Sequence, residues 1–261
     1  MPNIEKHAPG SFCWIELATT DQNAAKGFYA GIFDWVAVDF PMGPDEVYTM
    51  FNLDGHNAAA AYRLKPEMQS QGIPPHWMLY VTVANADETA ARMPALGGKL
   101  MKEPFDVFDA GRMAVIQDPT GAAFCLWQAN KHIGAQRIDE VNTLCWSELL
   151  TTDKPKALEF YSKLFGWTMK TNPSDPNQYT EFSNQGKPIG GIMQIRKEMG
   201  NMPSNWSPYF MVASVDDIAA KAQQSGATLR MPPTDIPNTG RFASIADPQG
   251  AGFSIFQPAA R

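Results

Sequence analysis

The chain has 261 residues, of which 44% are hydrophobic and 18% are charged, and its formal net charge is −6. This acidic balance provides no basic surface for neutralising phosphates, so it argues against nucleic acid as a partner and leaves neutral or cationic small molecules open. The sequence shows neither a secretory signal pattern nor an apolar run of about 18 residues, so we expect a cytoplasmic protein without membrane contact. Its three cysteines lack CxxC spacing and predict neither a disulfide framework nor a structural zinc site.

The first half of the chain predicts the order β-α-β-β-β twice. A buried strand ends at Thr20 and Asp21, whose side-chain oxygens can cap the helix that follows, and that helix carries apolar residues at helical spacing. Three strands come next, with a tight-turn signal at Asp54-Gly55 between the last two. A loop over residues 65–75 leads to a second strand and a second helix, and then to three further strands. The predicted strands cover residues 35–40, 46–53, 57–64, 77–83, the region near 100, 113–117 and 123–128, and the second helix covers 87–96.

The second half repeats the first. The segment FCWIELATTDQNAAKGFYAGIFDWVAVD, from Phe12, shares about 12 of 28 positions with LCWSELLTTDKPKALEFYSKLFGWTMKT, from Leu144. The correspondence continues through YTMFNLDG and YTEFSNQG and through the GR steps and DPxG turns near each end. The spacing of about 130 residues indicates two complete domains rather than a solenoid.

We predict an α+β protein with two duplicated domains. The boundaries that we expect are an N-terminal tail over residues 1–10, a first domain over 11–129, a polar linker over 130–141 and a second domain over 142–258. We expect His7 and His132 to be exposed to solvent, because they fall in the tail and the linker.

Four βαβββ modules in pairs, a TTD-capped first helix and a DPxG turn before the last strand resemble the vicinal oxygen chelate superfamily. This group includes glyoxalase I, bleomycin resistance proteins and extradiol dioxygenases, and the resemblance is closest to its two-domain glyoxalase-like members. It implies that each domain forms a cupped mixed sheet. The fold does not by itself identify an activity.

The resemblance also implies where a metal site would lie, with ligands on the first, fourth, fifth and eighth strands of a domain. In the first domain the ligand positions on the first, fifth and eighth strands fall at Trp14, near Met78 and at Cys125. In the second domain they fall at Trp146, near Ser207 and at Ser254, and neither fourth strand contains a carboxylate. A divalent ion needs about three or more converging N, O or S ligands, so we expect no metal and no cofactor.

A shared glutamate is the main candidate for chemistry. Strand alternation places Glu16 on the same face as Trp14, and the position two residues past the ligand position on the fifth strand is Tyr80. The second domain has Glu148 and Tyr209 at these positions. A carboxylate in an apolar cup needs a partner, which could be the tyrosine hydroxyl, water or an arginine. The candidate arginines are Arg112 and Arg241, each of which follows a glycine.

The remaining candidate ligand contacts line the same cups. Cys125 faces the cup, although no neighbouring cation in sequence favours a reactive thiolate. The second cup is expected to be more polar, because Glu181 stands where the first domain has Met50. Residues expected to contact a ligand are Trp14, Met78, Arg112, Cys125, Trp127, Trp146, Glu181, Ser207, Arg241 and Ser254.

Three functions remain open at this point. The first is a metal-free protein that binds a small molecule in one or both cups, in the manner of bleomycin resistance proteins, and that could form a homodimer. The second is a glyoxalase-like lyase or a hydroxylase that uses Glu16 or Glu148 as general base with Tyr80 or Tyr209 as its partner. The third is a non-catalytic interaction protein. A glutamate that bridges strands is also a common structural feature.

Overall fold

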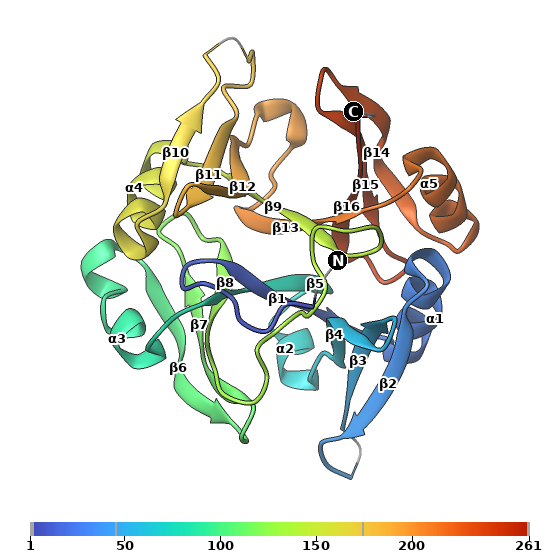
Figure 1. Ribbon diagram of the computed structural model, residues 1–261, viewed down its shortest axis with the longest axis horizontal. Coiled ribbons are helices and arrows are strands. Elements are labelled where there is room, and N and C mark those ends of the chain that lie inside the picture. Colours follow the sequence, from blue (N-terminus) through green and yellow to red (C-terminus); the bar gives the residue numbers. More distant parts are fainter. Residues whose placement is uncertain (1–2, 45, 174, 260–261) are drawn as a thin grey trace.

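The computed structural model describes residues 3–44, 46–173 and 175–259. Its two halves each form one eight-stranded mixed sheet, as the duplication predicts (Figure 1). The elements of the first half are β1 (Phe12–Thr19), α1 (Gln22–Phe33), β2 (Val36–Pro41), β3 (Val47–Leu53), β4 (His56–Arg63), α2 (Pro66–Ser70), β5 (His76–Thr82), α3 (Ala86–Ala91), the 3-10 helix Pro94–Leu96, β6 (Lys99–Val107), β7 (Gly111–Gln117) and β8 (Ala123–Ala129).

The second half repeats this order with small differences in length. Its elements are β9 (Leu144–Thr151), α4 (Lys154–Phe165), β10 (Thr168–Thr171), β11 (Thr180–Asn184), β12 (Lys187–Gln194), the 3-10 helix Lys197–Met199, β13 (Asn205–Met211), α5 (Val215–Gln224), β14 (Thr228–Ile236), β15 (Gly240–Ala246) and β16 (Gly252–Pro258). None of the helices in the described part of the chain is long and apolar enough to span a membrane.

Strand order is the same in the two sheets. It is β2-β3-β4-β1-β5-β8-β7-β6 in the first and β10-β11-β12-β9-β13-β16-β15-β14 in the second. The first strand of each domain therefore lies in the middle of its sheet, between a parallel neighbour and an antiparallel one. The α+β class and the paired βαβββ modules predicted from the repeat are confirmed by this topology.

Local sequence signals explain where the main helices begin. Asp21 accepts a hydrogen bond of 3.0 Å from Ala24 N, and Asp153 accepts one of 3.1 Å from Lys156 N. Each aspartate therefore satisfies a backbone N–H that has no partner within its helix. One helix was missed, because α2 occupies part of the predicted loop over residues 65–75. It has Pro66 in its first turn, where the missing N–H and fixed φ of proline are tolerated.

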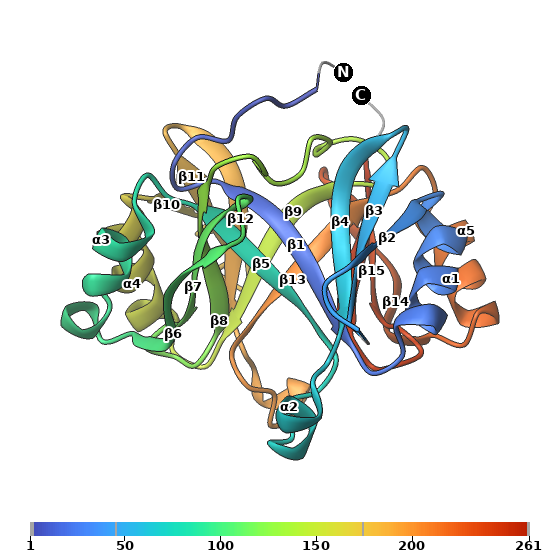
Figure 2. The same cartoon turned by 90° about the horizontal axis from the view of Figure 1, so that it is seen from below.

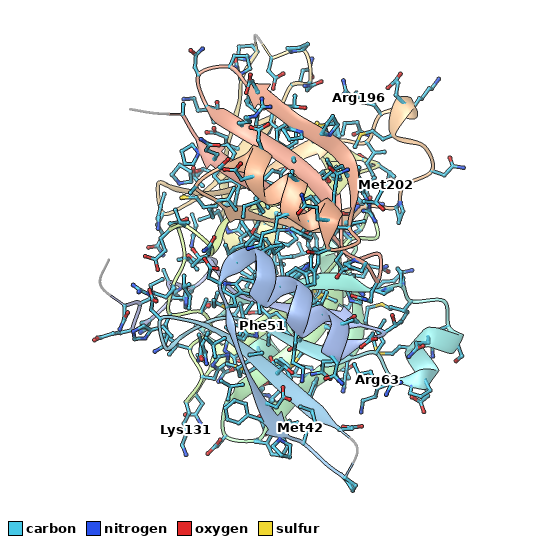
Figure 3. The ribbon with its side chains drawn as sticks, turned by 90° about the vertical axis from the view of Figure 1, so that its right-hand side faces the viewer. Met42, Phe51, Arg63, Lys131, Arg196 and Met202 are labelled. Carbon is cyan, nitrogen blue, oxygen red and sulfur yellow. The ribbon has the colours of Figure 1, made fainter. Side chains whose placement is uncertain are left out.

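Side chains alternate between the two faces of each sheet. In β1, Ile15 and Leu17 belong to the large apolar core on the helix side, whereas Trp14 and Glu16 point to the opposite, concave face. On β3, Phe51 belongs to the same core and lies against α1, while Met42 lies out near the tip of the β2–β3 hairpin (Figure 3). The concave faces of the two sheets form the cups that the resemblance implies.

The convex faces and their helices join the two domains. One continuous apolar core contains residues of both halves, with α1 beside α5 and α3 beside α4 (Figure 1). Tyr29 on α1 donates a hydrogen bond of 2.9 Å to Asp247, and Tyr161 on α4 donates one of 2.9 Å to Asp118. Because the convex sides face each other, the two cups open in opposite directions.

Candidate functional site

The first cup contains a hydrogen-bonded network around Glu16. Tyr80, on β5, donates from its hydroxyl to Glu16 Oε1 at 3.0 Å, so the structure brings together the glutamate and tyrosine that the sequence places in one cup. Tyr48, on β3, donates to Glu16 Oε2 at 2.7 Å and accepts a bond of 3.2 Å from Trp14 Nε1. Two tyrosine hydroxyls, from β3 and β5, therefore hold the carboxyl group of Glu16 on β1 in place, and Trp14 holds one of the two tyrosines (Figure 2 shows the three strands).

The second cup repeats this network. Tyr209, on β13, donates to Glu148 Oε1 at 2.9 Å, and Tyr179, just before β11, is also hydrogen-bonded to Glu148. Trp146 Nε1 donates to the Tyr179 hydroxyl at 2.8 Å. The Trp-Tyr-Glu-Tyr arrangement is thus a feature of both domains.

Tyr48 and Tyr179 are the members of these networks that the sequence analysis missed. They occupy matching positions in the repeated segments YTMFNLDG and YTEFSNQG, so the duplication itself contained the signal. Their contact with the glutamates crosses a whole strand, because β4 lies between β3 and β1 in the first sheet and β12 lies between β11 and β9 in the second. A large side chain spans that distance, which a comparison of adjacent strands does not reveal.

Burial sets the protonation behaviour of the two networks. Desolvation raises the pKa of Glu16 and of Glu148, and the hydrogen bonds from the tyrosines act in the opposite direction. Burial and the neighbouring glutamate raise the pKa of Tyr80 and of Tyr209, so both hydroxyls remain protonated donors. Each cup therefore presents a carboxyl group that keeps its proton to a higher pH than an exposed glutamate does.

The cups differ in the side chains that flank the glutamate. Met78 is opposite Glu16 in the antiparallel pair β1–β5, and Ser207 takes the same place opposite Glu148. On β8, Cys125 is in register with Tyr80 of β5. On β16, Ser254 is in register with Tyr209 of β13. The second cup has hydroxyl groups where the first has sulfur.

Cys125 has the environment of a structural thiol. It is 1% exposed, and burial raises its pKa well above the usual value, with Glu16 as a further cause. A thiolate is the reactive form of cysteine, so this site disfavours nucleophilic chemistry.

Glu181 lies on the concave side of the second sheet, at its wall rather than its floor. It is in register with Gly191 on β12, which is in register with Glu148 on β9. The first domain has Met50, Ala60 and Glu16 in these places. The Glu181 side chain is exposed to solvent, so it adds a charge to the rim of the second cup.

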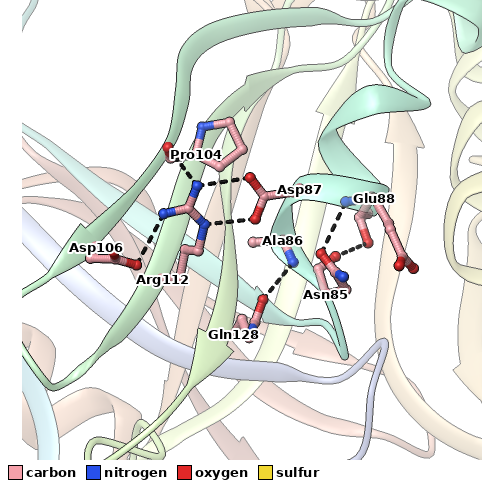
Figure 4. A network of polar contacts seen from close by, with 9 residues as sticks. Asn85, Ala86, Asp87, Glu88, Pro104, Asp106, Arg112 and Gln128 are labelled. Atoms are coloured by element: carbon pink, nitrogen blue, oxygen red, sulfur yellow. Dashed lines mark hydrogen bonds and ion pairs between the residues drawn. The ribbon is translucent and has the colours of Figure 1, made fainter.

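The expectation that Arg112 or Arg241 pairs with the glutamates is wrong. Arg112 bonds instead to Asp87 on α3, at 2.6 and 2.7 Å, and to Asp106 on β6 (Figure 4). Strand alternation is the reason, because Met113 and Val115 pack in the cup and Arg112 therefore points to the helix side. Arg241 bonds in the same way to the two aspartates Asp216 and Asp235.

The segment after β8 lies over the first cup, although the sequence analysis placed it in an exposed linker. The ring of His132 stands edge-to-face against Trp14, with centroids 4.7 Å apart, and 5.9 Å from the ring of Trp127. Trp127 Nε1 donates to the backbone oxygen of His132 at 2.9 Å. His7 is 7% exposed and is bonded through Nε2 to the backbone oxygen of Ala135 at 2.8 Å. The prediction that both histidines are solvated is therefore wrong, whereas Lys131 points outward (Figure 3).

The donor set does not fit a divalent metal ion in either cup. Trp14 and Trp146 occupy the first-strand ligand positions, and their indole nitrogens are committed as donors to tyrosines. Within the described residues, no group of three or more His, Cys, Asp or Glu side chains is arranged to hold an ion. The first cup has the carboxylate of Glu16, and the second has that of Glu148 with Glu181 at its rim, which is fewer than the three or so ligands that such a site requires.

Two grooves lie between the domains and away from both cups. One has a volume of about 430 Å³ and is formed by the tail around Gly10, the end of β5 and the end of α4. The other, about 230 Å³, lies between α1 and α5. The repeat relates the two grooves, and they follow from the way the domains pack.

Comparison with known proteins agrees with this architecture. The family model described as the Glyoxalase/Bleomycin resistance protein/Dioxygenase superfamily matches residues 11–126 and 137–255. The chain belongs to this superfamily. The resemblance noted from the sequence is therefore confirmed.

Relatives of known name cover almost the whole chain. The protein is 42% identical over 261 residues to "Putative glyoxylase CFP32" of Mycobacterium tuberculosis (strain CDC 1551 / Oshkosh), with 99% of each chain covered. It is 31% identical over 268 residues to the anthracycline biosynthesis protein DauV of Streptomyces sp. (strain C5), with 97% of this chain and 95% of that protein covered.

Solved structures share the fold at low sequence identity. The Mn(II)-bound glyoxalase from Novosphingobium aromaticivorans superposes with a TM-score of 0.66 at 16% identity, covering 95% of this chain and 82% of that one. The 2,3-dioxygenase LapB from Pseudomonas sp. KL28 gives a TM-score of 0.67 at 13% identity, covering 97% and 94%. These similarities concern the fold alone.

Proposed function

We propose that the protein binds a small organic molecule in one or both cups without a divalent metal ion. The observation that carries this proposal is the replacement of the metal-ligand set by a Trp-Tyr-Glu-Tyr network in both domains. The network fixes a carboxyl group in a concave, largely apolar surface, which is the usual form of a small-molecule site. The free cysteines are consistent with action in the cytoplasm.

The cup surfaces favour a ligand with an aromatic or otherwise apolar body and few polar groups. Trp14, Met78 and Trp127 provide apolar surface in the first cup, and Trp146 and Phe242 provide it in the second. Glu16 and Glu148 can accept a hydrogen bond when charged and donate one when protonated. The name of the relative DauV refers to anthracycline biosynthesis, which supports including an anthracycline among the compounds tested.

Elemental analysis and ligand titration together test this proposal. The purified protein is expected to hold less than about 0.1 equivalent of any divalent metal that binds with the affinity of a family site. A panel of neutral, hydroxylated aromatic compounds is expected to shift the fluorescence or the indole NMR signals of the cup tryptophans. A loss of binding in Glu16→Gln or in Glu148→Gln shows which cup holds the compound. Arg112→Ala is the control, because Arg112 points away from the cup. A stoichiometric metal ion in a cup, or no binding from the whole panel, would overturn the proposal.

A second candidate function is proton transfer catalysed by the same glutamates, in a lyase or in a hydroxylase. The raised pKa of Glu16 and Glu148 favours it, because a general base works best when its pKa lies near the operating pH. Tyr80 and Tyr209 would position the carboxylate, which would remove a proton from a carbon or oxygen of the bound substrate. Replacing the glutamate by glutamine is expected to lower turnover by about 10²–10⁴-fold while leaving the structure intact. Unchanged turnover in both Glu16→Gln and Glu148→Gln would exclude this function.

A further inference from the structure

The two cups have the same network but differ in what covers them. In the first cup Trp14 is 3% exposed and Trp127 is 4% exposed. The repeat places Trp146 and Phe256 at the matching positions of the second cup, and both side chains are partly exposed. Because the duplication keeps the floor of the cup similar, the difference in exposure comes from a segment of the chain that covers only the first cup.

The cover of the first cup is the chain between the domains. Ala135 N donates to Cys13 O at 2.7 Å, and Gln136 N donates to Asn57 O at 2.8 Å, which fixes this segment to β1 and β4. The N-terminal tail holds it from outside, with Ile4 N bonded to Gln136 O at 3.1 Å. The segment and the tail lie together beyond the same end of the strands of the first sheet (Figure 2). No segment in the described part of the chain makes such contacts with Trp146.

His132 occupies the place of a ligand in the first cup. Its ring contacts the two indoles of Trp14 and Trp127 in edge-to-face geometry, which is a favoured arrangement for aromatic pairs. Within the described residues its Nε2 is buried and has no hydrogen-bond partner. The first cup thus accepts a flat heteroaromatic ring but does not satisfy the polar atom at its edge.

The second cup has the polar groups that the first lacks. Ser207, Ser254 and Glu181 stand at the positions of Met78, Cys125 and Met50. A ring placed against Trp146 and Phe256 would therefore find hydroxyl and carboxylate groups within the same cup. A ligand without polar atoms would cover Ser207 or Glu181 and leave it unpaired, which is costly, whereas a ligand with a polar atom at its edge can pair with it.

We propose that the second cup is the binding cup and that its ligand is a planar aromatic molecule with a ring N–H or hydroxyl at its edge. The ring takes the place against Trp146 and Phe256 that His132 takes against Trp14 and Trp127. The first cup is closed by the chain itself. This inference rests on the proposed function and adds the choice of cup and the class of ligand.

Benzimidazole is a suitable probe, because it is planar and has an N–H and a ring nitrogen, and indene is its isostere without polar atoms. Titration followed by the NMR signals of the indole N–H groups reports on each cup, since the protein has seven tryptophans and Trp14 and Trp146 can be assigned by substitution with phenylalanine. In the wild-type protein benzimidazole is expected to shift the Trp146 signal and leave the Trp14 signal in place. Indene is expected to bind at least about 10-fold more weakly than benzimidazole, because it leaves the polar groups of the cup without a hydrogen-bonding partner.

Two variants complete the test. Trp146→Ala is expected to weaken benzimidazole binding by about 10-fold or more, because it removes one aromatic contact from a small site. His132→Ala is expected to open a second site, seen as a new shift of Trp14, without changing the affinity of the second cup. His132→Gln, which keeps most of the side-chain volume, provides the same comparison if His132→Ala unfolds.

The possible outcomes separate this inference from the proposed function. Benzimidazole in the first cup of the wild-type protein, equal binding of indene, or unchanged affinity in Trp146→Ala would overturn the inference alone. Binding of other aromatic compounds without any binding of benzimidazole would also overturn it and leave the proposed function standing. Failure of every aromatic compound to bind the wild-type protein and the His132 variants would overturn both.

Discussion

The hydroxyl of Tyr29 in the first domain donates a hydrogen bond of 2.9 Å to the carboxyl group of Asp247 in the second domain. The same hydroxyl accepts a bond of 3.1 Å from Trp77 Nε1. Asp247 is 3% exposed and belongs to the DPxG turn before β16. Tyr161, Asp118 and Trp206 repeat the arrangement with the domains exchanged, so the turn that marks the family in sequence also joins the two halves.

Tyr29→Phe is expected to destabilise the protein through this contact. The substitution leaves the Trp77 indole N–H without its acceptor and removes one donor from Asp247, and each buried polar group left unpaired costs about 1–3 kcal/mol. Urea unfolding of Tyr29→Phe and of the matched Tyr161→Phe should show similar losses. A loss below about 0.5 kcal/mol, the range of ordinary surface substitutions, would mean that water replaces the lost partner.

The pH dependence of stability is expected to reveal Glu16 and Glu148. Their folded-state pKa lies above the usual 4.5, so their contribution to stability is present below about pH 4.5 and is lost as the pH rises through the folded pKa. The double substitution Glu16→Gln and Glu148→Gln removes this loss. Its stability relative to the wild-type protein should therefore increase between about pH 4.5 and pH 8, as measured by urea unfolding at several pH values. A difference that shrinks over this range would contradict the raised pKa values.

The sequence was sufficient for the fold and for part of the site because both depend on regular patterns. Duplication located the domains, and strand alternation placed Glu16 and Trp14 on one face, where Tyr80 on the neighbouring strand meets the glutamate. The same rule, applied from Cys125 through its partner Val115, would have placed Arg112 on the opposite face. Arg112 is close in sequence to residues of the cup, but this closeness did not predict on which face of the sheet its side chain lies.

The cover of the first cup could not be predicted in the same way. The segment around His132 has no periodic pattern, and the backbone hydrogen bonds that fix it to β1 and β4 are with Cys13 and Asn57, more than 50 positions away. A polar linker between duplicated domains is ordinarily exposed, and here a few backbone hydrogen bonds and two ring contacts fix it to the sheet. The asymmetry between the cups is therefore a property of the folded chain that the two aligned halves do not show.

Gly191→Ala is expected to disrupt the network of the second cup. A Cβ atom at Gly191 would lie 2.0 Å from the Tyr179 hydroxyl oxygen, so the tyrosine must move away from Glu148 and Trp146. Such overpacking costs about 1–3 kcal/mol, and the loss of one donor should raise the pKa of Glu148 further. Carbon-13 NMR titration of the glutamate carboxyl groups measures this directly.

The first cup supplies the control for this substitution. Ala60 is the residue that corresponds to Gly191, and Tyr48 still reaches Glu16 beside it. Ala60→Gly should leave the titration of both glutamates unchanged and lower stability by about 0.5–1 kcal/mol, the usual effect of glycine in a strand. An unshifted Glu148 in Gly191→Ala would show that Tyr179 does not stabilise its charged form.

Cys125 is expected to be unreactive in the folded protein. It is 1% exposed and its pKa is raised by burial, so little thiolate is available to attack a reagent. Alkylation with iodoacetamide followed by mass spectrometry should modify Cys125 only under denaturing conditions. Modification at the rate of a free thiol in the native protein would require the first cup to open.

His132 provides the test of whether the cover stays in place at neutral pH. Burial lowers the pKa of His132 from 6.5 to about 4, and His7 nearby acts in the same direction. Its contribution to stability is therefore present above about pH 6.5 and is lost as the pH falls through about 4, where the buried ring takes up a proton.

The wild-type protein should lose more stability than His132→Gln across this window, and the Trp14 indole signal should move toward that of an exposed indole as the cover opens. His76→Gln is the matched control, because burial also lowers the pKa of His76, which pairs with Ala18 at the other end of β1 and makes no contact with the cover. Equal losses in the wild-type protein and in His132→Gln would show that protonation of this ring does not open the first cup.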